Sequence, residues 1–158
     1  MNFSSEYYGQ VTCINGHVAT NFYEGGDYQR WCGSCGKQTI AACPSCHWPL
    51  RGSYRDLIHS REPDAYCLHC GKALPWTESK LDAVREVAKL VDGLTDNDRK
   101  TLNEILPDLI STEATPSTQV AALKMKSLVK KGGKVFAESV QKIIVDVISE
   151  TAKKTLFP

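Results

Sequence analysis

Hydrophobic and polar positions follow two different spacings along the chain, and the spacing changes at Pro75-Trp76. Before this pair, short runs with strand-forming residues are separated by Gly and Pro, which is typical of β-strands joined by turns. These runs are residues 10–12, 17–20 and 38–40. After the pair, apolar residues recur every three or four positions, as in amphipathic helices. We therefore expect an α+β fold, with a β unit over residues 1–76 and a helical unit over residues 77–158.

Four amphipathic helices are expected in the second unit. Two of them begin with a capping-box pattern, in which Ser or Thr precedes an acidic side chain by three residues. These pairs are Ser79 with Asp82 and Thr95 with Asp98. A third helix begins at Thr115-Pro116, where proline occupies the first helical position. The expected ranges are about 77–92, 95–107, 115–131 and 134–154.

Two sequence features are expected to end helices. Pro107 should end the second helix because proline lacks a backbone N–H, and Gly132-Gly133 should separate the third helix from the fourth. The apolar faces of the last two helices must be buried against other parts of the protein or a partner. They consist of Val120, Leu123 and Leu128, and of Phe136, Val140, Ile143, Ile144, Val147 and Ile148.

Composition places the chain among globular proteins that keep their thiols reduced. Of its 158 residues, 42% are hydrophobic and 23% are charged, as in ordinary globular domains. No apolar run is long enough to span a membrane, and residues 1–10 lack the pattern of a secretory signal. We therefore expect a cytoplasmic protein, in which clustered cysteines indicate metal rather than disulfides. The count of seven cysteines also leaves one unpaired in a disulfide framework.

The cysteines form closely spaced pairs with the spacing of zinc ligands. Three Cys-x-x-Cys turns are present, and two of them continue into Gly-Lys, where glycine suits the tight turn beneath a metal ion. A fourth half-site replaces the second cysteine by histidine after three intervening residues. Structural zinc takes four tetrahedral sulfur or nitrogen ligands. The sequence therefore predicts two zinc ions, one bound by Cys13, His17, Cys32 and Cys35, and the other by Cys43, Cys46, Cys67 and Cys70.

Other arrangements of the same residues are possible. The half-sites could pair in a cross-braced order, but only seven residues separate Cys35 from Cys43, and sequential pairing into tandem zinc ribbons with short β-hairpins is favoured. Iron in the four-cysteine site is a chemical alternative to zinc. A redox pair at Cys32 and Cys35 is disfavoured because the surrounding pattern is not a βαβ unit.

Two closed four-ligand sites favour a structural role over catalysis. A hydrolytic zinc needs an open position for water, which four protein ligands do not leave. No Ser/His/Asp arrangement, phosphate loop or paired-carboxylate motif can be identified in the sequence. We therefore expect a non-catalytic interaction or assembly module, which binds a protein partner or forms a homo-oligomer through its C-terminal helices.

The distribution of charge suggests a second hypothesis, an accessory protein that binds nucleic acid. Residues 77–115 carry a net charge of −4 and residues 116–158 a net charge of +5. Basic side chains that could contact phosphates are Lys124, Lys126, Lys130, Lys131 and Lys134, and aromatic residues that could stack on bases are Trp31, Trp48, Tyr54 and Trp76. Residues 1–76 weaken this hypothesis because their six basic side chains are balanced by six acidic ones. Membrane binding is not expected, since acidic and basic side chains alternate beyond Lys134.

The ordered motifs of the first unit resemble the bacterial family catalogued as domain of unknown function 2321. They are Gln10-Val11-x-Cys13-x-Asn15-Gly16-His17-Val18, Cys32-x-x-Cys35-Gly36, Ile40-x-x-Cys43-Pro44-x-Cys46, Arg51-Gly52, and Tyr66-Cys67-x-x-Cys70-Gly71-Lys72-x-x-Pro75-Trp76. The likeness continues through Leu106-Pro107-Asp108-Leu109 and Thr115-Pro116 into the C-terminal helices. It implies a bacterial, cytoplasmic zinc-ribbon protein and no particular reaction.

Overall fold

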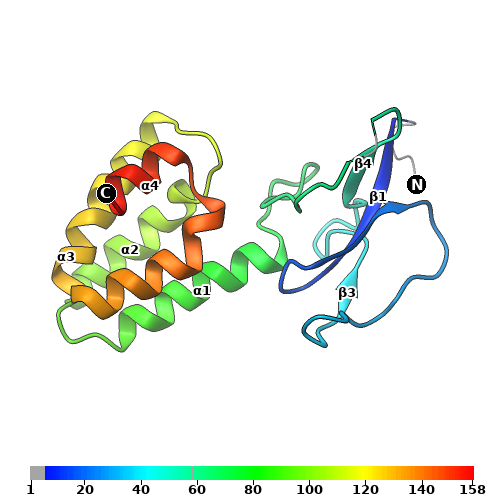
Figure 1. The fold of residues 1–158 in the computed structure, drawn as a ribbon. Coiled ribbons are helices and arrows are strands. Elements are labelled where there is room, and N and C mark those ends of the chain that lie inside the picture. The colour runs from blue at the N-terminus through cyan, green and yellow to red at the C-terminus, as the bar shows by residue number, and fades with distance from the viewer. Residues whose placement is uncertain (1–5, 58) are drawn as a thin grey trace. The chain divides into compact units, whose positions relative to one another are not determined.

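The structure is a computed structural model that describes residues 6–57 and 59–158. The chain divides into two compact units, Met1–Glu78 and Ser79–Pro158 (Figure 1). Antiparallel strands and both cysteine-rich groups belong to the first unit, and helices make up the second. The α+β fold expected from the sequence is therefore confirmed.

One strand organises the first unit. β1 (Tyr7–Cys13) pairs with β2 (Val18–Tyr23) along one edge. Along its other edge, the C-terminal end of β1 pairs with β3 (Thr39–Ile40) and the N-terminal end pairs with β4 (Arg51–Tyr54). All pairings are antiparallel. The four strands therefore form a single antiparallel sheet.

The sequence pattern gives no sign of strand β4. Its residues Gly52 and Ser53 are poor strand formers, yet both are buried. A Cβ atom at Gly52 would collide with the carbonyl oxygen atoms of Gly9 and Asn21. Glycine therefore marks a close approach between backbones, which is one of its positional meanings within strands.

The hydrophobic core of the first unit is small and includes metal-ligand side chains. It consists of Cys43, Leu50, Cys67, Leu74 and Trp76, with Ile40 and Cys46 packed against it. A core of this size stabilises a fold weakly unless cross-links or metals reinforce it. The cysteines therefore belong both to the core and to the metal-ligand set.

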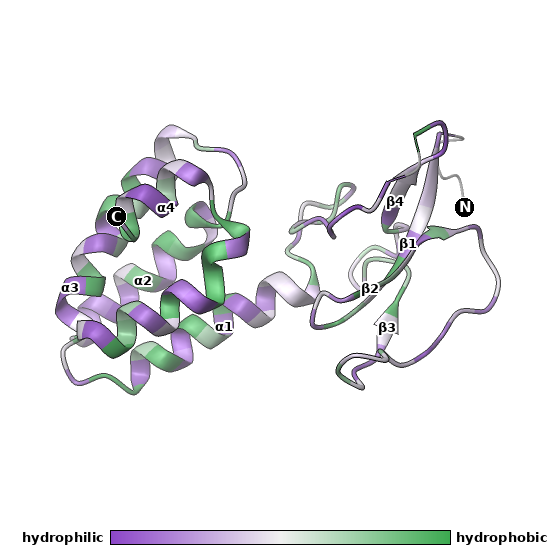
Figure 2. Cartoon of the chain, viewed as in Figure 1, coloured by the Kyte–Doolittle hydropathy of each residue, from purple (hydrophilic) through white to green (hydrophobic). Residues whose placement is uncertain are grey.

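Within the described residues, the second unit consists of four helices, the first of which begins in the last residues of the first unit, and a 3₁₀ turn. Apolar and polar positions alternate around each helix (Figure 2). The longest helix, α3 (Pro116–Ile144), contacts both α2 (Asp96–Leu109) and α4 (Glu150–Leu156). None of these helices is both long and apolar enough to span a membrane. The elements are α1 (Pro75–Lys89), α2 (Asp96–Leu109), α3 (Pro116–Ile144), η1 (Val145–Val147) and α4 (Glu150–Leu156).

The predicted helix starts are correct for α2 and α3 and wrong for α1. Thr95 and Asp98 form both hydrogen bonds of a capping box, and Thr115 caps α3 ahead of proline. By contrast, α1 begins at Pro75, so the predicted box at Ser79 lies inside the helix. Proline at the first position already fixes a helical φ angle and needs no hydrogen-bond partner for its nitrogen.

The predicted helix ends are corrected at two places. Pro107 does not end α2, which continues to Leu109. The helix expected over residues 134–154 is interrupted after Ile144, and α4 starts afresh after Ser149, whose hydroxyl accepts a hydrogen bond from the N–H of Ala152 at 3.2 Å. A buried N-cap serine competes with helix continuation because its side chain satisfies a free N–H group at the new start.

The predicted break at Gly132-Gly133 is present as a kink. Gly133 has φ 82° and ψ −176°, which is outside the helical region, although helical residues continue on both sides of it. A Cβ atom at Gly132 would collide with the ring of Phe136. The two glycines therefore allow the chain to bend while Phe136 stays fully buried.

The buried face of α3 differs from the prediction in its first half. Val120 and Leu123 are 52% and 62% exposed, whereas Ala121, Ala122 and Met125 are buried. Leu128 is buried as expected. In the last stripe, Phe136, Val140, Ile144 and Ile148 are buried within this unit, and Ile143 and Val147 are partly buried.

Candidate metal centres

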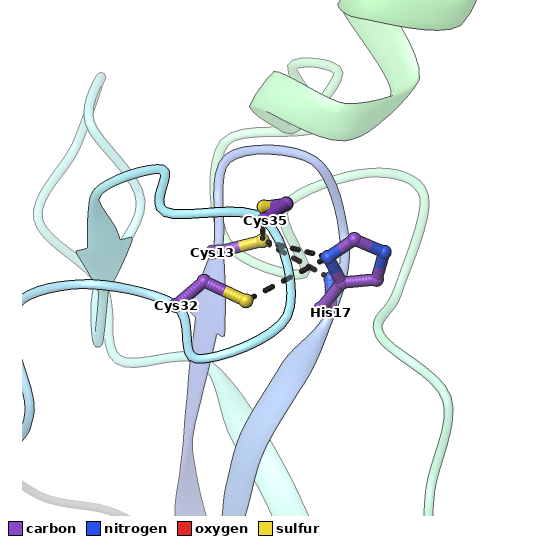
Figure 3. Close-up of side chains that lie close together, drawn as sticks. All are labelled: Cys13, His17, Cys32 and Cys35. Atoms are coloured by element: carbon purple, nitrogen blue, oxygen red, sulfur yellow. Dashed lines mark hydrogen bonds between the residues drawn. The ribbon is translucent and has the colours of Figure 1, made fainter.

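The first cluster brings together residues from the connection between β1 and β2 and from the turn between β2 and β3. Cys13 ends β1 and His17 immediately precedes β2, while Cys32 and Cys35 lie in the turn before β3 (Figure 3). The Sγ atom of Cys13 lies 3.5 Å from His17 Nδ1 and 3.7 Å from the Sγ atom of Cys35. The Sγ atom of Cys32 lies 3.7 Å from His17 Nδ1.

These separations fit a tetrahedral zinc ion. With Zn–S of about 2.3 Å and Zn–N of about 2.0–2.1 Å, a regular tetrahedron places two sulfurs about 3.8 Å apart, and a sulfur and a nitrogen about 3.6 Å apart. The Nδ1 atom of His17 faces the sulfurs and would be the ligand atom. The first cluster could therefore hold a zinc ion.

The second cluster consists of cysteines alone. The Sγ atoms of Cys43 and Cys70 lie 3.9 Å apart, and those of Cys46 and Cys67 lie 3.6 Å apart. All four sulfurs lie within 4.8 Å of one another, which again fits the sulfur separation of about 3.8 Å expected around zinc. Cys43 and Cys67 are buried and Cys70 is exposed, so the ion would sit at the edge of the small core.

The three Cys-x-x-Cys turns share one backbone pattern. In each, the first cysteine donates its N–H to the carbonyl five residues later, and its own carbonyl accepts an N–H from the residue four positions later. That residue has positive φ in every case, namely Gly36 at 71°, His47 at 61° and Gly71 at 74°. The glycines are the ones that the sequence indicated, whereas His47 is a histidine where glycine would be unstrained.

Backbone N–H groups point at the sulfur atoms. Ser34 donates to Cys32 Sγ at 3.4 Å, His69 donates to Cys67 Sγ at 3.4 Å, and His17 donates to Cys13 Sγ at 3.3 Å. The side-chain amide of Asn15 also donates to Cys35 Sγ at 3.6 Å. Such outer hydrogen bonds stabilise thiolates and fix the orientation of metal ligands.

The hydrogen bonds prepare some thiols for deprotonation. The N–H of Ser34 lowers the pKa of Cys32 to about 6. Burial raises the pKa of Cys67, but hydrogen bonds from the N–H groups of Cys70 and His69 and from the side chains of Cys46 and Cys43 together lower it to about 7. Both thiols thus reach the thiolate form, which is the form that binds metal, more easily than an ordinary cysteine.

Cys46 shows why the second cluster calls for a cation. The N–H of Trp48 lowers its pKa, but burial and the neighbouring sulfur atoms of Cys67, Cys70 and Cys43 raise it to about 12. Four crowded thiolates repel one another unless a positive charge lies between them. A divalent ion at the centre supplies that charge, so metal binding and loss of the thiol protons are linked.

The structure brings all eight predicted ligands together in the sequential grouping, and each group could hold one zinc ion.

One aromatic contact beside the second cluster could not be predicted from the sequence, which shows only that the two residues are present. The ring of Trp48 stacks on that of His69, with centroids 4.3 Å apart and planes 5° apart. This stack joins the two turns of the second cluster, and His69 is therefore a packing residue.

Comparison with known proteins identifies one family. A family model described as an uncharacterised protein conserved in bacteria (DUF2321) matches residues 6–156. The matched range contains both cysteine clusters and all of the described helices. No curated protein and no solved structure matches the chain.

Proposed function

Because the chain belongs to the bacterial family DUF2321, and because its ligand residues form two closed four-ligand groups, we propose that it is a zinc-stabilised, non-catalytic interaction module. It binds a protein partner or a second copy of itself. The single observation that carries the proposal is the closure of both groups, since four protein ligands complete the tetrahedral shell of structural zinc.

The role of zinc in this proposal is to fold the first unit. Its apolar core is small, and structural zinc contributes about 10–16 kcal/mol in small zinc-finger peptides. The two ions would therefore fix the turns on which exposed side chains are presented. Trp31, which is 64% exposed, adjoins the ligand Cys32.

The surface available for self-association differs from the one expected from the sequence. Ile144 and the stripe around it are buried within the helical unit, so they are not free to contact another chain. The outer face of α3 instead exposes Val120 and Leu123. Apolar side chains on a polar surface are typical of the centres of protein interfaces.

Native mass spectrometry of complexes isolated from bacterial cells with the tagged full-length chain tests this proposal. We expect two zinc ions per chain and a complex of discrete stoichiometry, either with another protein or with a second copy. Leu123→Glu should leave the zinc content unchanged and weaken self-association through α3. A chain that carries two zinc ions but is always isolated as a single protein would contradict the proposal.

Nucleic-acid binding is the second candidate, and the lysines of α3 favour it. Lys124 and Lys130 are exposed, and no ion pair of either is found among the described residues. Lys131 pairs with Asp98, and Lys134 lies 3.8 Å from Glu138. Replacing Lys124 and Lys130 by Gln should then reduce the salt dependence of binding by about one phosphate contact each.

The aromatic residues support nucleic-acid binding less than the lysines do. The indole of Trp76 is buried and donates to the carbonyl of Asp64 at 2.8 Å. Tyr54 packs edge-on against Tyr7, and Trp48 is covered on one face by its histidine partner. Of the predicted stacking residues, Trp31 is the one that is exposed and for which no ring contact is found within the described part of the chain.

A further inference from the structure

A hollow beside the first metal cluster has the size of a ligand-binding groove. Its volume is about 420 Å³, which is within the usual range of binding pockets. It is lined by Gly26, Asp27, Tyr28, Arg30, Trp31, Gln38 and Thr39, and we call these residues the aromatic groove. The groove lies outside the eight-ligand set.

The turn between the ligands Cys32 and Cys35 holds the walls of the groove in place. Trp31 and Gln38 pair as an antiparallel bridge on either side of the Cys32–Cys35 turn. The N–H of Thr39 donates to the carbonyl of Arg30 at 2.9 Å. The groove is therefore preformed wherever this turn is folded, which lowers the entropic cost of binding.

Two aromatic rings stand in the groove. Trp31 is 64% exposed and Tyr28 is 38% exposed. The ring of Tyr23 braces that of Tyr28 edge-on at 5.4 Å, and the hydroxyl of Tyr23 donates to the carbonyl of Gly26 at 2.7 Å. Tyr23 thus fixes the orientation of the Tyr28 ring, whereas the ring of Trp31 is exposed to solvent.

Several polar side chains of the groove carry hydrogen-bond donors for which the described part of the chain offers no partner. Among the described residues, no hydrogen bond is found for the indole N–H of Trp31, the hydroxyl of Tyr28, the side-chain amide of Gln38 or the guanidinium of Arg30. These groups can all donate. Donors beside exposed aromatic faces suit a ligand that offers carbonyl oxygens and apolar rings.

We propose that the aromatic groove binds a proline-rich segment of a protein partner in the polyproline II conformation. Such a segment has no internal hydrogen bonds, so its carbonyls point outward and need donors, while proline itself has no N–H to satisfy. Its rings pack against exposed aromatic side chains. Asp27, at the edge of the groove, would accept a basic side chain that flanks the prolines.

The charge of the groove favours such a peptide over single-stranded nucleic acid. Arg30 is balanced by Asp27 within the groove. The adjacent three-cysteine, one-histidine cluster would carry a net charge of −1 with zinc bound. A groove that follows a phosphate backbone needs an excess of positive charge.

The proposal rests on the interaction function proposed above, and it is tested with a ten-residue polyproline peptide and the zinc-loaded full-length chain. In ¹⁵N-resolved NMR titrations, we expect saturable shifts at Tyr28, Trp31 and Gln38, including the indole N–H of Trp31. The indole signals of Trp48 and Trp76 should not move. A Gly-Ser peptide of the same length should produce no saturable shifts.

Matched variants distinguish binding in the groove from non-specific binding elsewhere on the protein. Trp31→Ala should raise the Kd for polyproline about tenfold or more, as is typical of a central aromatic contact, and Tyr28→Phe should raise it by a smaller factor by removing one donor. Trp48→Ala, at an exposed tryptophan outside the groove, should leave the Kd unchanged. Native mass spectrometry of each variant should still give two zinc ions, which verifies that the first unit is folded.

Three results would overturn the proposal. They are the absence of saturable shifts at millimolar polyproline, a Kd unaffected by Trp31→Ala, and stronger salt-dependent shifts of the same residues with a single-stranded oligonucleotide. If the cellular complex survives Trp31→Ala and polyproline does not bind, the groove proposal fails while the interaction function stands.

Discussion

Gly16 and Trp76 connect the two metal clusters. Gly16 lies between the ligands Cys13 and His17 and has φ 92°, and a Cβ atom at this position would lie 3.2 Å from the Cβ atom of Trp76. Trp76 belongs to the core that contains Cys43 and Cys67 of the other cluster. A change at Gly16 is therefore expected to affect both clusters.

Gly16→Ala should weaken zinc binding by the first cluster and destabilise the first unit. The left-handed backbone costs a residue with a Cβ atom about 1–2 kcal/mol, and the crowding against Trp76 adds to that cost. Gly25→Ala is the matched control, since Gly25 has φ 112° but no atom within 4 Å of the added Cβ. Zinc competition with a chromophoric chelator measures the difference, and equal losses in the two variants would show that the Trp76 contact is unimportant.

His47→Gly should stabilise the first unit. His47 is exposed and has φ 61°, which is the left-handed conformation that its counterparts Gly36 and Gly71 adopt without strain. We expect a gain of about 1 kcal/mol, partly offset by the greater entropy of glycine in the unfolded chain. Chemical denaturation monitored by tryptophan fluorescence checks the sign.

Gly36→Ala and Gly71→Ala complete this comparison. Nothing lies within 4 Å of a Cβ atom at either position, so both variants report the backbone conformation alone. Each should lose about 1 kcal/mol, the reverse of the change at His47. A loss of stability on His47→Gly would mean that the histidine side chain has a role of its own.

Asp98 should make the stability of the helical unit depend on pH under acidic conditions. The hydrogen bond from Lys131, at 2.8 Å, and then that from the N–H of Thr95 lower the pKa of Asp98 from 3.8 to about 2. Because the folded state holds this carboxyl ionised, its contribution to stability is present above about pH 4 and is lost as the pH falls toward about 2.

The comparison of the wild type with Asp98→Asn isolates this effect, because zinc loss at low pH affects both proteins alike. Urea denaturation followed by circular dichroism should show the wild type to be more stable at pH 7, with a difference that shrinks between pH 4 and pH 2. Lys134→Met is the control, since Lys134 is 86% exposed and the one ion pair found for it among the described residues is a 3.8 Å contact with Glu138. A difference that does not vary with pH would contradict the assignment.

Removing zinc should unfold the first unit and leave the helices folded. The core of the first unit includes the ligands Cys43 and Cys67, whereas the helical unit buries apolar side chains of its own, such as Leu102, Met125 and Phe136. Hydrogen exchange with and without a chelator should show lost protection in residues 6–57 and 59–74 and unchanged protection in α2 and α3. Simultaneous loss in both units would contradict this division.

The metal clusters could be predicted because their chemistry is local in sequence. A Cys-x-x-Cys turn fixes two ligands by itself, so Cys32 and Cys35 are recognisable without knowledge of the fold. The contact between Gly16 and Trp76 could not be predicted, because it depends on how a distant segment packs. Similarly, β4 is formed by the close approach of Gly52 to Gly9, which the pattern of side chains does not encode.

The helical unit shows a different limit of sequence reasoning. On α3, two neighbouring faces are both apolar, and periodicity does not say which of them is buried. The structure buries the face with the small side chains of Ala121 and Ala122 and exposes Val120 and Leu123. Pro107 was expected to end its helix, yet α2 continues for two further residues, to Leu109. A proline so near a helix end disturbs few of the helix's hydrogen bonds.

X-ray absorption at the zinc edge, combined with elemental analysis of the purified full-length chain, tests the central claim of two closed zinc centres most directly. The account predicts two zinc ions per chain, surrounded in total by seven sulfur atoms at about 2.3 Å and one nitrogen atom at about 2.0–2.1 Å. Fewer than two metal ions per chain, or an oxygen ligand from water on either ion, would contradict it.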